Sequence, residues 1–164
     1  MVPEVILTLI ARDDMNAEDP VIELSDDEAR DFLASQRFGR LAMVLIDEPE
    51  IVPVNFVLST EGEHGDTIYI NTAQGNKLFA AAVGRTLAFE ADEVGEEFAT
   101  SAIAYGNGRI VNTTEEADLA ARLGLRAWVA TYKSSIVAID ISRMSGRRFR
   151  LGPPPANPVS EVPG

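Results

Sequence analysis

The chain has 164 residues, of which 46% are hydrophobic and 24% are charged, a composition typical of a single globular domain with its own core. Its formal net charge of −12 argues against nucleic acid or an anionic membrane as partner, because both require a basic face. No segment approaches the roughly 20 apolar residues that cross a bilayer, and the absence of cysteine excludes disulfides and thiolate chemistry, so we predict a cytoplasmic protein.

Charge is unevenly distributed along the chain. Residues 1–50 hold 13 acidic and 4 basic residues, whereas residues 101–150 hold 4 acidic and 8 basic ones. The densest basic group comprises Arg143, Arg147, Arg148 and Arg150. An anionic ligand is therefore expected at the C-terminal third, the alternative being a solvated basic face.

The first half predicts an arm, a helix and a hairpin. Residues 1–21 form an N-terminal arm. Ser25-Asp26-Asp27-Glu28 matches a capping box, so a helix should begin there and end near Gly39. Two apolar runs, 41–46 and 51–58, predict a hairpin joined by residues 47–50. Pro53 cannot donate to a strand ladder and marks a bulge or a sheet edge.

The second half predicts more strands and two further helices. Alternation predicts a strand over 86–92, and Gly106 and Gly108 predict a bulge or a close approach within a strand over 101–111. Thr113 to Glu116 forms a second capping box, and Gly124 should end that helix. A helical turn around Trp128 and a strand over 135–141 follow. The proline-rich tail, 152–164, is expected to be disordered.

The segment from Ile68 to Lys77 is the most informative in the sequence. A short apolar strand leads through Asn71-Thr72-Ala73-Gln74-Gly75-Asn76 into a helix expected over 76–83, and Lys77 stands at its start. Backbone amides and a cation at a strand-to-helix corner suit a phosphate group. The alternative is an ordinary glycine-containing turn with a solvated lysine. The single histidine, His64, lies in a polar turn and is interpreted as a solvated loop residue. The sequence predicts no metal site.

The order of elements predicts a mainly β fold with a few helices, arranged as a small antiparallel barrel. Neither apolar run of the hairpin alternates cleanly, so both faces should be covered, by a helix or by a second subunit. Within this order, the chain resembles the split-barrel flavin-binding proteins related to pyridoxamine 5′-phosphate oxidase. Five segments carry the resemblance, at residues 39–42, 52–57, 71–77, 89–92 and 145–148.

The resemblance implies an antiparallel split barrel over residues 22–151 that forms a homodimer with flavin mononucleotide (FMN) at each subunit interface. It places the phosphate at Lys77, with Asn71 and Thr72 as polar neighbours and Arg40 as a further candidate. The backbone of Val54, Asn55, Phe56 and Val57 would face the flavin ring. The partner subunit would contribute Ser101 and Arg148.

Three of these residues have alternatives. Arg40 could pair with a local acid, Asn55 could bond to the backbone beside Pro53, and Arg148 could be solvated. A tryptophan that many relatives carry near the cofactor is absent from 100–103.

We expect an FMN-binding oxidoreductase that acts on an unidentified small molecule. No catalytic residue is predicted, because the flavin supplies the redox chemistry. The alternatives are a deazaflavin-dependent reductase, a flavin-binding or storage protein without turnover, and a structural dimer that has lost its cofactor. Pyridoxamine-phosphate oxidase activity itself is not predicted, because the C-terminal arginine and histidine elements that hold its substrate are not recognisable.

Overall fold

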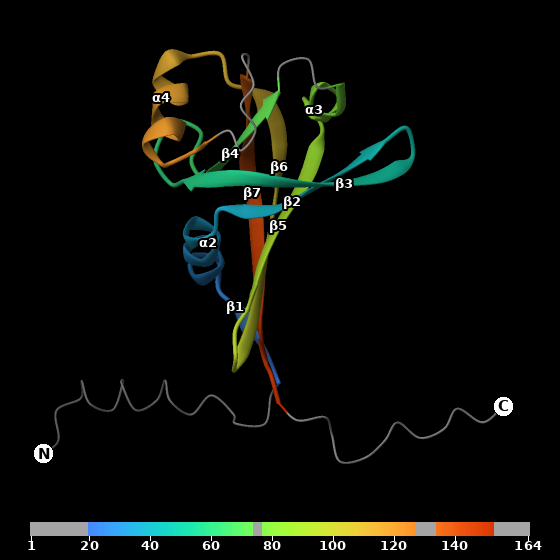
Figure 1. Cartoon of the computed structure of the whole chain (residues 1–164), viewed down its shortest axis with the longest axis vertical. Helices are drawn as coiled ribbons and strands as arrows, with labels where there is room; N and C mark the ends of the chain where they lie inside the picture. The colour runs from blue at the N-terminus through green and yellow to red at the C-terminus, as the bar shows by residue number, and fades with distance from the viewer. Residues whose placement is uncertain (1–19, 74–76, 127–133, 153–164) are drawn as a thin grey trace, which may run out of the picture.

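The computed structural model describes residues 20–73, 77–126 and 134–152 (Figure 1). Most of the predicted N-terminal arm, the predicted helical turn around Trp128 and the predicted tail beyond Gly152 lie outside these ranges. The described elements are β1 (Val21–Leu24), α2 (Asp26–Ser35), β2 (Phe38–Leu45), β3 (Glu48–Ser59), β4 (Thr67–Ala73), α3 (Lys77–Ala82), β5 (Thr86–Val94), β6 (Phe98–Ile110), α4 (Thr114–Arg122) and β7 (Ser134–Arg150).

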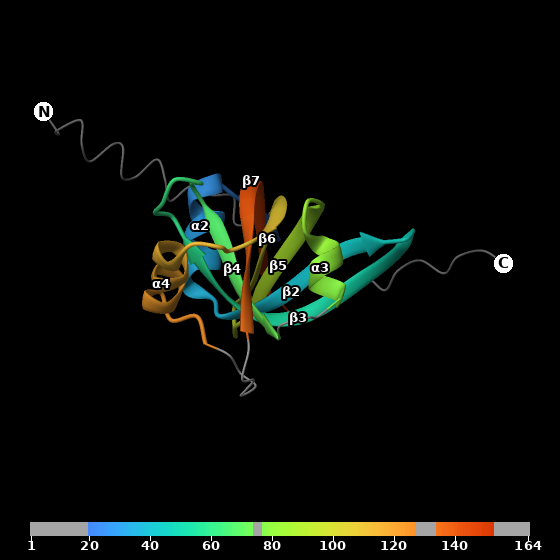
Figure 2. The same ribbon diagram turned by 90° about the horizontal axis from the view of Figure 1, so that it is seen from above.

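The strands form one antiparallel sheet that curls back on itself. Its order is β1-β7-β4-β3-β2-β5-β6, and an additional pairing of β6 with β7 closes six of the strands into a ring (Figure 2). The ring is uneven. β6 pairs with β7 along the whole of Phe98–Ile110, whereas β2 meets β5 over Arg40–Ala42 and β3 meets β4 over Phe56–Ser59. The fold is thus mainly β, as the sequence predicts, with its strands splayed where the pairing is short.

The last strand, β7, is much longer than the predicted 135–141. Its first half pairs with β4 and its second half with β1, a short strand that the sequence analysis missed. The lower ends of β5, β6 and β7 extend beyond the ring (Figure 1). The C-terminal basic residues therefore lie on a strand, where alternation distributes them over two faces.

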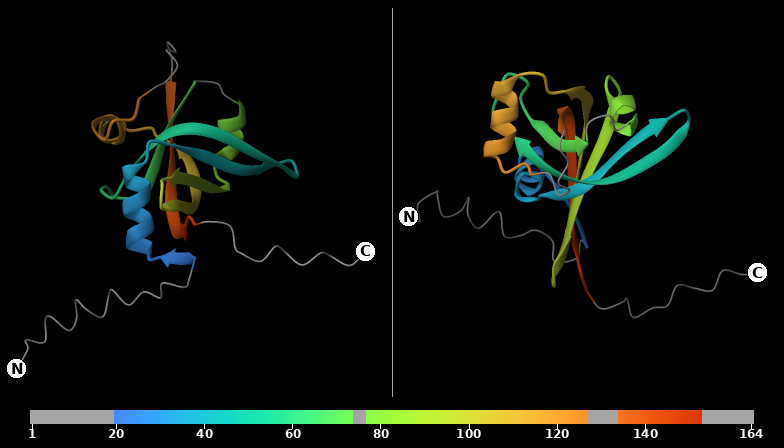
Figure 3. Two further views of the ribbon diagram at one scale, coloured as in Figure 1. Left: turned by 60° about the horizontal axis from the view of Figure 1, so that its bottom comes forward. Right: turned by 45° about the horizontal axis from the view of Figure 1, so that its top comes forward.

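The core fills the ring and continues under two helices. Alternate residues of β5, namely Leu87, Phe89 and Ala91, are fully buried, which confirms the predicted alternation. Ala29 and Leu33 of α2, and Phe79 and Ala82 of α3, pack into the same core cluster as these strand residues. Helix α4 packs outside the ring, where a second cluster contains Val57, Tyr69, Ala120 and Ala138. Both α2 and α4 lie on the same side of the ring (Figure 3).

The ends of α2 and α4 confirm part of the predicted capping. Ser25 and Glu28 form both bonds of the first capping box. In the second capping box only one of the two hydrogen bonds forms: the Thr113 side chain accepts from the amide of Glu116 at 3.4 Å. The Glu116 carboxylate bonds to other residues instead of the Thr113 amide. Gly124, with φ of 93°, follows the end of α4 as predicted. Its amide donates to Ala121 O, and the next amide donates to Ala120 O, both at 3.0 Å, the bonds of a Schellman motif.

The predicted role of Gly39 as a helix stop is wrong. Helix α2 ends at Ser35, and the extended residue Gln36 follows it. Gly39 lies within β2, where a Cβ would stand 2.4 Å from the carbonyl oxygen of Glu90. Glycine is needed there because β2 and β5 cross closely.

The hairpin turn is also shorter than predicted: Ile46 and Asp47 make it, both with positive φ. At Pro53, β3 pairs with β2 alone among the described strands, which confirms the predicted edge.

Gly106 and Gly108 mark close approaches, as predicted. A Cβ on Gly106 would lie 2.2 Å from the carbonyl oxygen of Asp140, and the register between β6 and β7 shifts between Tyr105 and Gly106. Ser142 is the extra residue of this bulge, and its hydroxyl donates to Tyr105 O at 3.1 Å. Among the described residues, no helix is long and apolar enough to cross a membrane.

Candidate functional site

Four polar residues singled out from the sequence share the outer face of the ring. They lie on four different strands, next to residues whose side chains are buried in the core. Alternation then directs the four outward. We call this set the outer row: Arg40, Asn55, Asn71 and Ser101. The strand order β6-β5-β2-β3-β4 places them across one continuous surface.

The resemblance assigned Ser101 to the partner subunit's part of the site, but Ser101 lies beside Arg40 of the same chain, and an acidic residue on the strand between them joins the two. Nη1 of Arg40 donates to Oε2 of Glu90 at 3.1 Å, and the hydroxyl of Ser101 donates to Oε1 of the same carboxylate at 3.0 Å. Arg40 also pairs with Asp92. The structure therefore contains the ion pairs that the sequence left open for Arg40, and an anion approaching this guanidinium must compete with two carboxylates.

Asn55 connects the outer row to the segment after α4. Its Nδ2 donates to the carbonyl oxygen of Arg126, which lies far away in the sequence. The predicted alternative, a bond to the backbone beside Pro53, is not the one observed. Asn55 and Phe56 also line a cavity of about 380 Å³, which we call the Asn55 cavity. On the neighbouring strand, Asn71 lies one residue beyond the Phe56–Ile70 pair, as Asn55 does, so both residues lie on the same face just past the end of this ladder.

The other residues of the predicted ring-contacting strand have buried side chains. Val54 and Phe56 belong to the central core. Thr72 of β4, the predicted polar neighbour of the phosphate, is also buried, with 8% of its surface exposed. Val57 points outward but is covered by α4. A ligand on the outer face can therefore reach this strand through its backbone and through Asn55.

Lys77 and Arg148 are not brought into the outer row by the described structure. Lys77 opens α3, and its side chain and residues 74–76 lie outside the description, so its predicted role remains a prediction. Arg148 pairs across the strands with Thr100, whereas Ser101 pairs with Arg147. Ser101 and Arg148 hence lie on opposite faces of the sheet. Arg148 faces α2, where its charge helps to lower the pKa of Glu28, a shift caused mainly by the capping hydrogen bonds from Ser25.

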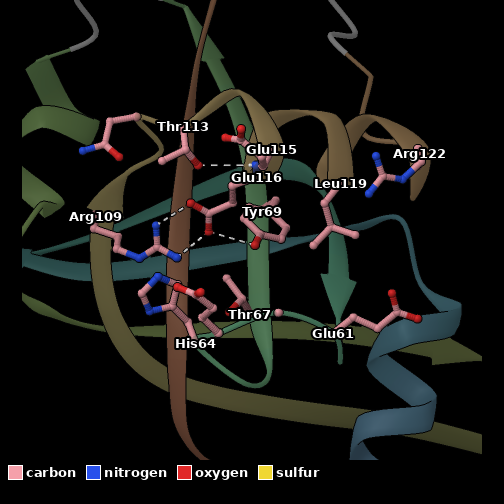
Figure 4. Close-up of a pocket in the computed structure, with 13 residues that line it drawn as sticks. Glu61, His64, Thr67, Tyr69, Arg109, Thr113, Glu115, Glu116, Leu119 and Arg122 are labelled. Carbon is pink, nitrogen blue, oxygen red and sulfur yellow. Dashed lines mark hydrogen bonds and ion pairs between the residues drawn. The ribbon is translucent and has the colours of Figure 1, made fainter.

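Sequence reasoning missed an ion-pair network centred on Arg109 of β6 (Figure 4). The guanidinium donates to Glu116 of α4 and to Asp140 of β7, with Nη1–Oε2 and Nε–Oδ2 distances of 2.8 and 2.7 Å. The hydroxyl of Tyr69 donates to the same Glu116 carboxylate at 2.9 Å. The only signal in the sequence was that Arg109 is the single charged residue of β6.

This network shifts two pKa values in opposite directions. The hydrogen bond from Arg109 lowers the pKa of Glu116, against the effect of burial. Burial raises the pKa of Tyr69 to about 12, helped by its hydrogen bond to Glu116. Because Glu116 is ionised and Tyr69 is neutral over the whole physiological range, the network acts as a fixed clamp between α4 and the sheet.

A second cavity, of about 550 Å³, lies beside this clamp between α4 and the loop before β4 (Figure 4). We call it the Arg109 cavity. Its lining includes Glu61, His64, Arg122 and Leu119. His64 is exposed at this cavity. No group of three or more acidic or histidine side chains suited to a metal ion occurs in the described ranges.

A known family model covers most of this chain. The family model described as pyridoxamine 5′-phosphate oxidase matches residues 25–148. The chain belongs to the pyridoxamine 5′-phosphate oxidase-like family. The resemblance predicted from five short segments is thereby confirmed.

Solved structures support this assignment. A family member from Corynebacterium glutamicum is 33% identical, with a TM-score of 0.70, over 83% of this chain and 98% of that one. A FAD-binding protein from Mycobacterium smegmatis is 34% identical, with a TM-score of 0.69, over 80% of this chain and 100% of that one. A Corynebacterium diphtheriae protein of unknown function is 37% identical, with a TM-score of 0.69, over 80% of this chain and 99% of that one.

Proposed function

We propose that this chain binds a flavin nucleotide on the outer row and acts as a flavin-dependent oxidoreductase on a small molecule. The observation that carries the proposal is the similarity to the FAD-binding protein of Mycobacterium smegmatis, whose whole length this chain covers at 34% identity. Membership of the pyridoxamine 5′-phosphate oxidase-like family supports it.

The chemistry of the outer row fits a flavin ring. The polar edge of the ring carries both hydrogen-bond acceptors and a donor, and side-chain amides such as Asn55 and Asn71 supply both kinds of group. Beside them Phe38, which pairs across the strands with Asn55, is 41% exposed and offers an aromatic face. A planar ligand can thus be bonded at its edge and covered on its face.

FMN is the smallest nucleotide that meets these requirements, and it is also a part of FAD. Its phosphate calls for cations. Lys77 is our first candidate, and Arg40 is a second that would have to leave Glu90 and Asp92. A deazaflavin coenzyme remains the alternative ligand of the same surface.

A bound flavin would supply hydride or electron transfer. The chain itself would orient the ring through the β3 backbone and Asn55, and would exclude water from it. We propose that a second copy of the chain completes this enclosure. Val44 and Ile51, which are 57% and 68% exposed, lie on the same outer face as Arg40 and would be covered by such a partner.

The test is a titration of the purified protein, freed of endogenous ligand, with FMN, FAD, riboflavin and a deazaflavin coenzyme. We expect FMN or FAD to bind at least about 10-fold more tightly than riboflavin, the usual scale for one charge-assisted contact. Absence of binding of all four at saturating concentration would overturn the proposal.

The variant Glu90→Gln tests whether Arg40 of the outer row contacts the phosphate. If Arg40 contacts the phosphate, removal of one competing carboxylate should tighten FMN binding and leave riboflavin binding unchanged. Equal affinities in variant and parent would remove Arg40 from the site. Reduction of the bound flavin by a nicotinamide nucleotide, followed by reoxidation with a small acceptor, separates an oxidoreductase from a flavin-storage protein.

A further inference from the structure

We propose that the Asn55 cavity binds the anionic group, a carboxylate or a phosphate, of the small-molecule substrate. The proposal rests on the proposed function in one respect, that the flavin occupies the adjoining outer row. Anion binding itself is argued from the cavity and can be measured without flavin.

The cavity is built from three segments that are distant in the sequence. Its lining residues are Arg37, Asn55, Phe56, Leu123, Gly124 and Arg126. Two consecutive residues of β3 hold the other two segments in place. The amide of Phe56 donates to Arg37 O at 3.0 Å, and the side chain of Asn55 donates to Arg126 O. Both arginines are therefore anchored to β3 through their backbone carbonyl groups.

Local structure explains why Arg126 reaches this position. The Schellman motif at Gly124 turns the chain sharply after α4. Leu123 and Leu125 pack against the second hydrophobic cluster, the one under α4 that contains Val57 and Tyr69. On the other side, Nη1 of Arg37 donates to the carbonyl oxygens of Ala34 and Gln36, both at 2.7 Å. These bonds fix its guanidinium at the end of α2 and leave Nε and Nη2 without a partner among the described residues.

The charge of the cavity is opposite to that of the chain. Among the described residues that line it, the two charged ones are arginines and none is acidic. Arg30, Arg40 and Arg109 are each bonded to two carboxylates, and glutamates line the Arg109 cavity. Other described arginines, such as Arg85 and Arg122, also form no ion pair, but Arg37 and Arg126 share one cavity that has no acid among its described lining residues. Within the described ranges, neither Arg37 nor Arg126 has such a partner. In a chain with a net charge of −12, two arginines without carboxylates on one cavity indicate an anionic ligand, since guanidinium groups match carboxylate and phosphate geometry.

Size and lining define the ligand further. A volume of about 380 Å³ is at the lower end of the range for small-molecule sites. Leu123 provides apolar contact, and Asn55 is shared with the outer row. A small molecule with an apolar body could thus place its anionic group between the arginines and its reactive part beside the flavin.

The experiment uses benzoate and inorganic phosphate as probes and benzamide as the neutral analogue of benzoate, with binding followed by calorimetry on the full chain. We expect one or both anions to bind and benzamide to bind at least about 10-fold more weakly than benzoate. Arg126→Gln should weaken anion binding by about 10-fold or more. Its backbone carbonyl still accepts from Asn55, so the fold should be retained. Arg37→Gln should act in the same direction, and Arg37→Lys should restore part of the binding.

Arg122→Gln is the matched control, because it removes the same charge from the last turn of α4 but lines the Arg109 cavity instead. It should leave anion affinity unchanged. Failure of both anions to bind, or equal losses in Arg122→Gln and Arg126→Gln, would overturn the proposal.

Flavin titrations of the same variants separate the two proposals. If Arg126→Gln weakens FMN but not riboflavin, the cavity holds the cofactor phosphate, and the assignment to a substrate is wrong. If the parent protein binds no flavin but still binds anions through these arginines, the proposed function fails while the anion site stands.

Discussion

Nη1 of Arg109 lies 2.8 Å from Oε2 of Glu116, and this ion pair joins the long strand β6 to the outer helix α4. The two side chains are 26% and 13% exposed, so the pair is largely shielded from water. Helix α4 separates the two cavities: Arg122 lines one, and the segment just after the helix lines the other. The position of this helix thus decides the shape of both.

Replacing Arg109 should destabilise the protein. Arg109→Gln leaves the half-buried carboxylates of Glu116 and Asp140 close together without a cation, and we expect a loss of about 2–3 kcal/mol in the free energy of unfolding. Urea unfolding at neutral pH measures it. The exposed Arg122→Gln should change this free energy by less than about 0.5 kcal/mol, and a similarly small effect of Arg109→Gln would show that the clamp adds no stability.

The raised pKa of Tyr69 predicts a loss of stability in alkali. Its pKa is about 12 in the folded state against the ordinary tyrosine value of 10.0. The folded state therefore keeps its proton at pH values where the unfolded state loses it, so this contribution is complete below about pH 10 and is lost as pH rises towards 12. Tyr69→Phe should remove this part of the pH dependence. Parallel urea titrations of both proteins from about pH 9 to about pH 11 should converge, and a constant difference would contradict the shift.

Gly106→Ala should be among the more damaging single methyl additions. Its Cβ would lie 2.2 Å from the carbonyl oxygen of Asp140, so β6 and β7 must move apart at the bulge. We expect a cost of about 1–3 kcal/mol, visible as a lower melting temperature. Gly152→Ala, whose added Cβ meets no other part of the described structure within 4 Å, is the control. Equal melting temperatures would mean that the strands separate there freely.

Lys77→Ala tests the predicted phosphate contact. Removing the charge should weaken FMN binding by about 10- to 100-fold and riboflavin binding far less, because riboflavin has no phosphate. Titration of both ligands into variant and parent provides the comparison. A uniform decrease for the two flavins, or full retention of FMN, would place the phosphate elsewhere.

We expect a homodimer that buries the exposed apolar residues of the β2–β3 hairpin, which projects from the ring (Figure 2). Ile51→Lys should shift the protein towards monomer in light scattering at micromolar concentration, because a charge would enter the interface. Val94→Lys, at a site 70% exposed on β5, should not. A parent protein that is monomeric at this concentration would refute the prediction.

Features encoded by local spacing could be predicted from the sequence. The capping residue Ser25, the glycine after α4 and the alternation of Leu87, Phe89 and Ala91 depend on neighbours a few residues away, and the structure confirms them. Five short segments in order were enough to identify the family. Once the core face is known, strand alternation also places Arg40, Asn55, Asn71 and Ser101 on one face, whereas Thr72 and Arg148 do not belong to it.

Tertiary structure alone decided which distant residues meet. Gly39 looked like the end of a helix, but its requirement comes from the carbonyl of Glu90 on β5. Glu116 looked like the second half of a capping box, but Arg109 and Tyr69 offer stronger partners and take its carboxylate. Arg37 and Arg126 carry no sequence signal as a pair, because only the β3 backbone and Asn55 bring them to one cavity. Such contacts depend on how strands cross and helices pack, which local sequence patterns do not specify.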